Sequence, residues 1–277
     1  VFLLSAGWRS GSTLVQRLLA SSGDLMMWGE PYDHCGLVRS LAEGMRAFAE
    51  PWPPGAPRGQ WPPDGYVVDP HSPPKGNRWI ANAYPAPDDL LAAHRALFDR
   101  LFAVPASAAG FDRWGVKAVR LTGEHAVYLH ALYADARFVF LHRNPWDAWS
   151  SYRRRHEERP SAYWWYHRWP DEQVSQAGHF ARLWATSVDS FLSRGPDLGA
   201  LVIAYEDVVN GAALDALGEA AGVMVKRKVL RRRLGGALTD RSTPWRIPTE
   251  DADAVAEAVG PLAARLGYTG PTVEPGS

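Results

Sequence analysis

The first twenty residues place an apolar run, a loop of small residues and a helical pattern in direct succession. Val1–Ser5 is apolar enough for a buried strand, and Ala6–Thr13 is rich in glycine and hydroxyl residues. The apolar residues that follow recur at helical spacing, namely Leu14, Val15, Leu18 and Leu19. A turn of this kind presents main-chain N–H groups at the positive end of a helix dipole. The segment therefore predicts an anion-binding loop.

The loop also contains side chains that suit phosphate or sulfate. Gly11 lets the main chain approach a ligand closely, and Arg9 offers a guanidinium fork. Hydroxyl donors come from Ser10, Ser12 and Thr13. The nucleotide-kinase version of this loop has glycine at the position of Ala6 and lysine at the position of Ser12. The missing lysine argues against ATP or GTP chemistry, and a serine-rich turn that only caps a helix is the alternative.

A second anion site is predicted around Arg143. This arginine follows the apolar run Phe138–His142, and Pro145 suits the first turn of a helix that starts near Trp146. Arg143 is thereby placed at the carboxyl end of a strand, where open α/β sheets bind ligands. Ser151 comes eight residues later, about two turns into the helix. We expect Arg143 and Ser151 to converge on one phosphate if the connecting loop folds back.

The other polar residues of this helix are weaker candidates. Ser150 is adjacent to Ser151 but faces about 100° away on a helix. Arg153, Arg154 and Arg155 are interpreted mainly as a solvated helix face.

The order of the remaining patterns indicates an α/β fold with a central parallel sheet. Leu201–Tyr205 is a third strand candidate, and His125–Tyr133 and Gln176–Ser193 are helical. A last helix is expected from Thr249 to Leu266, with Thr249 as its cap. Alternation of strands and helices is typical of a parallel sheet covered on both faces. The stretch Pro51–Pro87, rich in proline, glycine and tryptophan, is expected to be an irregular insertion.

Composition narrows the range of partners. The 277 residues include 30 basic and 30 acidic side chains, so bulk attraction to nucleic acid or an anionic membrane is not expected. Only Lys75, Lys117, Lys226 and Lys228 are lysines, and an anion site will therefore be built mostly from arginine.

Cys35 is the only cysteine, which rules out an internal disulfide or a thiolate metal cluster and fits a reducing, cytoplasmic location. No apolar run is long enough to span a bilayer. The sequence opens at Val1 without a methionine, which leaves open a preceding signal or anchor.

Taken together, the two predicted anion sites resemble those of sulfotransferases that use 3′-phosphoadenosine-5′-phosphosulfate (PAPS). Arg9–Thr13 is similar to the 5′-phosphosulfate loop of that family. Phe138–Ser151 is similar to its 3′-phosphate motif, including the spacing from arginine to serine. Tyr205-Glu206-Asp207 resembles a segment whose tyrosine lies near the nucleotide, and Ser242–Trp245 resembles the segment that closes over it.

The resemblance implies one α/β domain over residues 1–277, with the P-loop-like sulfotransferase fold and no metal requirement. It implies PAPS as the donor and 3′,5′-adenosine bisphosphate as the product. The residues expected to bind the nucleotide are Arg9, Ser10, Gly11, Ser12, Thr13, Arg143, Ser151, Tyr205 and Trp245.

Catalytic roles follow from the same resemblance. Gly29-Glu30-Pro31 is similar to the branch that includes tyrosylprotein and many bacterial sulfotransferases, which makes Glu30 the expected general base. We expect Met26, Met27 and Trp28 to raise its pKa by providing a partly apolar site. Arg9 would stabilise the leaving phosphate, and Lys117 and Ser242 would bind the sulfuryl oxygens. His34 is the second candidate for the base, whereas His125 and His142 are interpreted as structural.

The acceptor is expected to be a small or glycosylated molecule with a hydroxyl group. That expectation rests on aromatic residues, which favour apolar or sugar rings, namely Trp52, Trp61, Trp79, Tyr84 and Tyr163–Tyr166. Packing of a core or lid explains each aromatic residue equally well. Two other functions remain open: a small-molecule kinase whose Mg²⁺ would need Asp147 or Asp207, and a nucleotide-binding module without catalysis.

Overall fold

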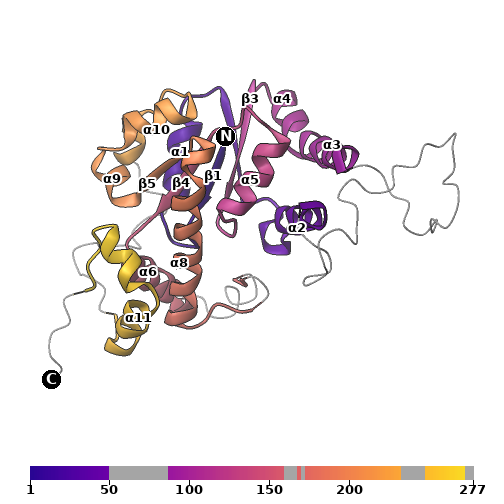
Figure 1. Ribbon diagram of the computed structural model, residues 1–277. Coiled ribbons are helices and arrows are strands. Elements are labelled where there is room, and N and C mark those ends of the chain that lie inside the picture. Colours follow the sequence, from indigo (N-terminus) through magenta and orange to yellow (C-terminus); the bar gives the residue numbers. More distant parts are fainter. Residues whose placement is uncertain (50–86, 159–166, 170–171, 232–246, 272–277) are drawn as a thin grey trace, which may run out of the picture.

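The computed structural model describes residues 1–49, 87–158, 167–169, 172–231 and 247–271. Within these ranges, five strands form one parallel sheet in the order β2-β3-β1-β4-β5 (Figure 1). The strands are β1 (Phe2–Ser5), β2 (Leu25–Gly29), β3 (Arg113–Ala118), β4 (Phe138–His142) and β5 (Leu201–Ala204). In the central strand β1, Leu3 pairs with Lys117 on one side and with Val139 on the other. The predicted α/β class with a central parallel sheet is confirmed.

Helices connect the strands and cover both faces of the sheet. The α-helices are α1 (Ser12–Ala20), α2 (Leu37–Ala49), α3 (Pro87–Phe98), α4 (Val104–Ala108), α5 (Gly123–Leu132), α6 (Pro145–Glu158), α8 (Ala177–Arg194), α9 (Tyr205–Asn210), α10 (Leu214–Ala221) and α11 (Thr249–Arg265). Shorter helical segments are η1 (Asp33–Cys35), the π-helical η3 (Asp99–Ala103), η4 (Pro196–Leu198) and η5 (Arg227–Arg231).

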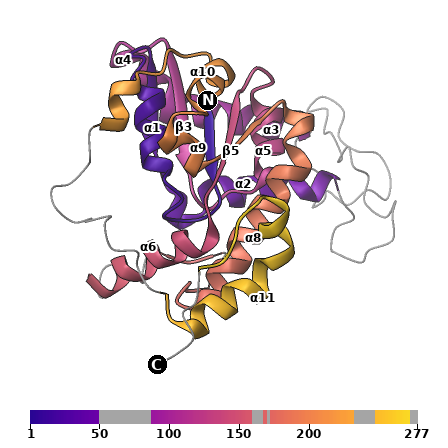
Figure 2. The ribbon, with the colours of Figure 1, turned by 90° about the vertical axis from the view of Figure 1, so that its left-hand side faces the viewer.

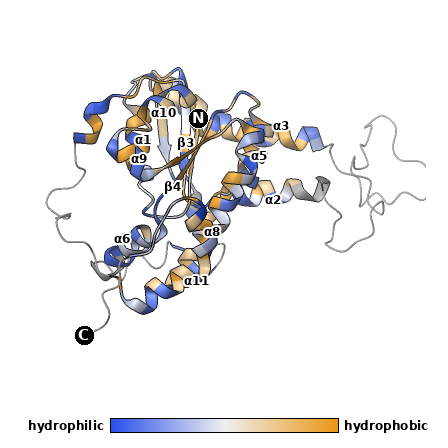
Figure 3. Ribbon diagram, turned by 60° about the vertical axis from the view of Figure 1, so that its left-hand side comes forward, coloured by the Kyte–Doolittle hydropathy of each residue, from blue (hydrophilic) through white to orange (hydrophobic). Residues whose placement is uncertain are grey.

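The strands β1 and β4 bury side chains on two opposite faces because helices lie on both sides of the sheet. On one face, Leu3 and Val139 pack in a cluster with residues of α1, α9 and α10. On the other face, Phe138 and Phe140 belong to a larger cluster with α5 and α8, where the rings of Phe140 and Phe191 stack 4.5 Å apart. Figure 3 shows helices such as α1 and α11 with one hydrophobic and one hydrophilic face. None of the helices in the described ranges has the length and apolar character needed to cross a bilayer.

Helices α6 and α11 extend the larger cluster beyond the sheet. Figures 1 and 2 both show α11 beside α8, near the end of the sheet from which α6 starts. The indole of Trp149 and the guanidinium of Arg153 both donate to Asp251 of α11, at 2.9 and 2.6 Å. Arg153 thus differs from the solvated face that is expected for most of the three arginines, because its ion pair joins α6 to α11.

The sequence patterns identify β1, β4 and β5, but not β2 and β3. Pro145 is the first residue of α6, as predicted. Tyr205 was expected to end a strand, but β5 ends at Ala204 and Tyr205 begins α9. Thr249 is the first residue of α11 and not its cap, since the extended Pro248 (φ −54°, ψ 144°) takes that position. Of the predicted insertion, only the start of α3 at Pro87 lies within the described residues.

Candidate active site

The candidate residues meet at one edge of the sheet because all five strands are parallel. Their carboxyl ends lead into the loop of Arg9 after β1, Glu30 after β2, Arg143 after β4 and Tyr205 after β5, and Lys117 lies near the end of β3. Residues from five separate parts of the chain therefore line the edge at which open α/β sheets bind ligands.

The loop after β1 turns sharply into α1. Gly7, Arg9 and Gly11 all have positive φ angles, of 76°, 63° and 88°. Such angles cost an arginine about 1–3 kcal/mol, and strain of this kind is concentrated at functional sites. Gly11 is the N-cap of α1, and no described side chain caps this helix end. The first N–H groups of α1 therefore provide the donors for an anion that the sequence predicts.

The three hydroxyl residues of the loop have different environments. Ser10 is fully buried, and its hydroxyl donates to the carbonyl of Gly7 at 3.1 Å. This side chain closes the loop, which differs from the ligand-donor role expected for it. Ser12 is also buried, whereas Thr13 is exposed on the first turn of α1.

Arg9 joins the loop to the second predicted anion site. Its Nε donates to Oγ of Ser151 at 3.1 Å, and its carbonyl accepts from the guanidinium of Arg143 at 3.0 Å. The structure thus brings together Arg143, Ser151 and the phosphate loop, as the two motifs predict.

The guanidinium of Arg143 is held on several sides. It lies over the ring of Tyr205, 4.8 Å from the centroid. The main-chain carbonyl of Arg143 accepts a hydrogen bond from the indole of Trp184 at 2.9 Å. The same tyrosine ring covers Gly11, where an added Cβ would collide with Cδ2 and Cε2 of the ring. The buried Nε of Arg143 has no hydrogen-bond partner among the described residues. A buried donor without an acceptor costs about 1–3 kcal/mol, and a ligand oxygen would remove that cost.

Behind Arg143, a carboxylate fixes the ends of β4 and β5. Glu206 accepts hydrogen bonds from the N–H of Asn144 at 3.0 Å and from the hydroxyl of Tyr268 at 3.1 Å. Tyr268 also bonds the imidazole of His142 at 2.7 Å, and Asn144 caps α6 through the N–H of Trp146. The sequence analysis did not single out Asn144 or Tyr268. The only signal was the glutamate in the Tyr205-Glu206 segment.

Glu30 and Lys117 form an ion pair at the other end of the edge. The lysine Nζ donates to Glu30 Oε1, and the N–H of Glu30 donates to the carbonyl of Lys117 at 2.8 Å. The lysine side chain is 7% exposed and the glutamate side chain 34%, so the carboxylate retains access from outside. A lysine this deeply buried requires a partner, because an unpaired buried charge costs several kcal/mol. Glu30 itself has a positive φ of 44°.

The residues next to Glu30 do not surround its carboxylate. Met27 packs in the cluster on the α1 face of the sheet, whereas Trp28 packs on the opposite face and its indole donates to the carbonyl of Phe102 at 3.3 Å. The partner of the carboxylate is the ammonium of Lys117. The structure thus places a cation beside the carboxylate, in addition to what the sequence analysis expected around Glu30.

His125 and His142, which the sequence analysis interprets as structural, both bond to neighbouring residues of the fold. His125 forms a capping box with Thr122 at the start of α5, and burial is the main cause that lowers its pKa to about 4. Burial likewise lowers the pKa of His142 to about 4, and this ring bonds Tyr268. His34 lies in η1, close behind Glu30 in the chain, and lines a cavity.

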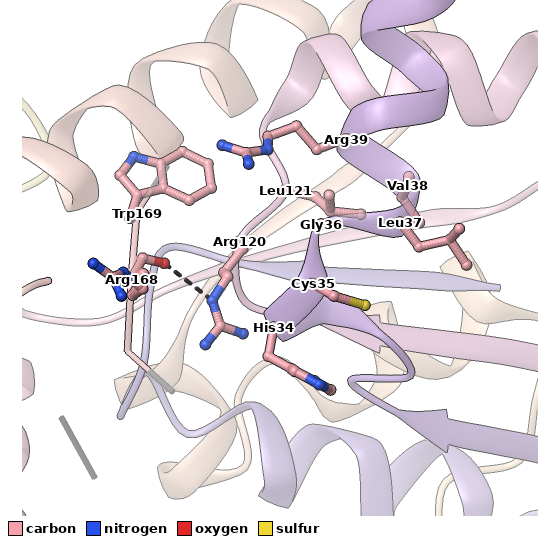
Figure 4. A pocket seen from close by; sticks show the side chains of 10 residues that line it. All are labelled: His34, Cys35, Gly36, Leu37, Val38, Arg39, Arg120, Leu121, Arg168 and Trp169. Atoms are coloured by element: carbon pink, nitrogen blue, oxygen red, sulfur yellow. Dashed lines mark hydrogen bonds between the residues drawn. The ribbon is translucent and has the colours of Figure 1, made fainter. Parts of the chain in front are cut away.

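That cavity was not anticipated from the sequence. It measures about 390 Å³ and is lined by η1, the start of α2, the residues after β3, and Arg168 and Trp169 (Figure 4). Ser242, Trp245 and the aromatic residues assigned to the acceptor lie outside the described residues. In the described part of the chain, no three or more His, Cys, Asp or Glu side chains form a group that could hold a metal ion.

A comparison with family models now identifies the chain. A model described as the sulfotransferase family matches residues 1–216, which include the phosphate loop, Glu30, Lys117, Arg143, Ser151 and Tyr205. The chain belongs to the sulfotransferase family. No match was found among curated proteins. The parallel sheet flanked by helices is consistent with the P-loop-like fold of these transferases.

Because the ring of Tyr205 packs on Gly11, a side chain at this position should destabilise the protein. Gly11→Ala should lower the free energy of unfolding by at least 2 kcal/mol, because it combines a positive φ with a collision against the tyrosine ring (roughly 1 kcal/mol for strain and 1–3 for overpacking). Gly110→Ala is the matched control, since its φ is +85° and no atom lies within 4 Å of the added Cβ. Urea denaturation of both variants measures the difference. Equal losses would contradict the described contact.

Proposed function

We propose that this sulfotransferase uses PAPS and transfers its sulfuryl group to a hydroxyl of a small or glycosylated acceptor. The observation that carries the proposal is the pair of hydrogen bonds from Arg9 to Ser151 and from Arg143 to Arg9. They join a phosphate loop to a second cationic site, which suits a nucleotide with phosphate groups at two positions.

The donor set fits such a nucleotide at both positions. The N–H groups of α1 and the guanidinium of Arg9 would bind the 5′-phosphosulfate, with Gly11 allowing close approach. Arg143, whose buried Nε lacks an acceptor among the described residues, and Ser151 would bind the 3′-phosphate. Tyr205 would position the nucleotide from the side of β5.

In the reaction, the acceptor oxygen forms a bond to sulfur while the bond from sulfur to the bridging phosphate oxygen breaks. Glu30 would accept the proton of the acceptor hydroxyl. Arg9 and Lys117 would stabilise the negative charge that develops on the bridging oxygen and the sulfuryl oxygens. The ion pair with Lys117 holds the carboxylate of Glu30 at the edge of the sheet before any ligand binds. Ser242 is proposed to donate to the sulfuryl group, as the family resemblance implies.

The 3′-phosphate assignment predicts a nucleotide-selective effect of Arg143→Ala. Loss of a charge-assisted contact should lower the affinity for 3′,5′-adenosine bisphosphate by about 10- to 100-fold, which calorimetry would measure. Adenosine-5′-phosphosulfate lacks the 3′-phosphate, and its affinity should barely change. Arg227→Ala serves as the control, because Arg227 pairs with Asp215 at the surface. Equal losses for both nucleotides would show that Arg143 only supports the loop through Arg9.

The base assignment predicts that Glu30→Gln lowers kcat by about 10²- to 10⁴-fold while the affinity for 3′,5′-adenosine bisphosphate stays the same. Glutamine retains an oxygen for Lys117 but cannot accept the proton. Glu124→Gln is the control, since Glu124 is a surface carboxylate paired with Arg194. Single-turnover transfer from labelled PAPS would measure kcat. A Glu30→Gln variant with full activity would show that another group, with His34 as the first candidate, takes the proton.

A further inference from the structure

The cavity beside Glu30 has a strongly cationic wall. Arg39 from α2, Arg120 after β3 and Arg168 line it, together with His34 and Trp169. Figure 4 shows the guanidinium of Arg120 between His34 and Arg168, with Arg39 and Trp169 farther along the cavity. Among the described residues that line the cavity there is no carboxylate. Three guanidinium groups thus gather at one cavity in a chain whose formal net charge is zero.

The cavity is lined by residues that lie close in the chain to the proposed catalytic groups Glu30 and Lys117. Pro31, directly after Glu30, lines a small apolar cavity with Val38 and Leu121, and these two residues also line the cationic cavity. Arg120 lies three residues after Lys117. Its guanidinium covers the ring of Trp8 in the phosphate loop, 4.9 Å from the centroid. The cavity therefore lies near Trp8 of the phosphate loop, through Arg120, and near Pro31, the residue after the proposed base.

Arg120 is the most buried of the three arginines. It is 9% exposed, and its Nε donates to the carbonyl of Arg168 at 3.2 Å. The main chain at Trp169 is held by a hydrogen bond from its N–H to the carbonyl of Glu172 at 2.7 Å and by a contact from its carbonyl to His179 at 3.2 Å. The fold thus holds Arg120 and the main chain of Trp169 in place, which reduces the ordering cost of binding at this side of the cavity.

The arginines also make the surroundings unfavourable for further positive charge. His125 illustrates this: burial is the main cause that lowers its pKa, and the charge of Arg39 lowers it further.

We propose that the acceptor of this enzyme is a small molecule that carries a carboxylate in addition to its hydroxyl, and that Arg39, Arg120 and Arg168 bind this carboxylate in the cavity. The inference rests on the proposed function, since it assigns the acceptor of the same site. Planar guanidinium groups match a carboxylate in geometry and charge. Trp169 and Leu121 would contact the body of the molecule, and a volume of about 390 Å³ suits a small ligand.

The test compares phenolic acids with their amides, which have the same shape without the charge. The probes are 4-hydroxybenzoate, 4-hydroxyphenylacetate and 3-(4-hydroxyphenyl)propionate, each paired with its carboxamide. Calorimetry is done on the full chain with and without 3′,5′-adenosine bisphosphate. At least one acid should bind about tenfold or more tightly than its amide. Arg39→Gln and Arg168→Gln should each remove most of that preference.

Arg265→Gln on α11 is the matched control and should leave the preference intact, because Arg265 lies away from the cavity and pairs weakly with Asp189 at 3.9 Å. The affinity for the bisphosphate should be the same in all variants. Equal affinity of acids and amides, no saturable binding of any acid, or a preference that survives in both cavity variants would overturn the inference. Failure of the bisphosphate to bind would instead contradict the proposed donor, so the two failures are distinguishable.

Discussion

Two hydrogen bonds of Arg9 join segments of the chain that lie 142 and 134 residues apart. One reaches Ser151 on α6, and the other comes from Arg143 at the end of β4. Neither contact exists until the parallel sheet has placed β1 and β4 side by side and α6 has folded back toward the loop. The proposed anion-binding edge is therefore a product of tertiary structure, although each motif that contributes to it is local.

The opposite end of the edge depends on a charged residue inside the sheet. Lys117 occupies a strand between Leu3 and Gly29, where an apolar side chain would be expected. Its ion pair with Glu30 makes the burial tolerable and also fixes the carboxylate. Replacing this pair with apolar residues of similar size need not destabilise the protein. A role in the reaction explains better than stability why a cation and a carboxylate stand there.

The sequence was sufficient for those parts of the fold whose local pattern is strong. β1, β4 and β5 are continuous apolar runs, and the loop before α1 has its own chemistry. β3 was missed because Gly115 and Lys117 interrupt its apolar pattern. β2 was missed although it is as long as β4 and apolar up to Trp28.

The candidate site shows the same division. The spacing of the motifs was enough to predict that Arg143 and Ser151 lie near the loop. It was not enough to predict that the hydroxyl of Ser10, expected to bind the ligand, donates to the carbonyl of Gly7 within the loop. The cavity of Arg39, Arg120 and Arg168 could not be predicted, because its residues come from three segments with no common pattern. Ser242 and Trp245 stay predictions.

All the roles proposed for this edge depend on its binding a nucleotide with a 3′-phosphate and without a metal ion. The most direct measurement is the thermal shift of the full chain with 3′,5′-adenosine bisphosphate in EDTA, compared with ATP and Mg²⁺. The account predicts stabilisation by the bisphosphate alone, by about 2.7 kcal/mol at 100 times its dissociation constant. Stabilisation by ATP with Mg²⁺ alone, or by neither ligand, would contradict it.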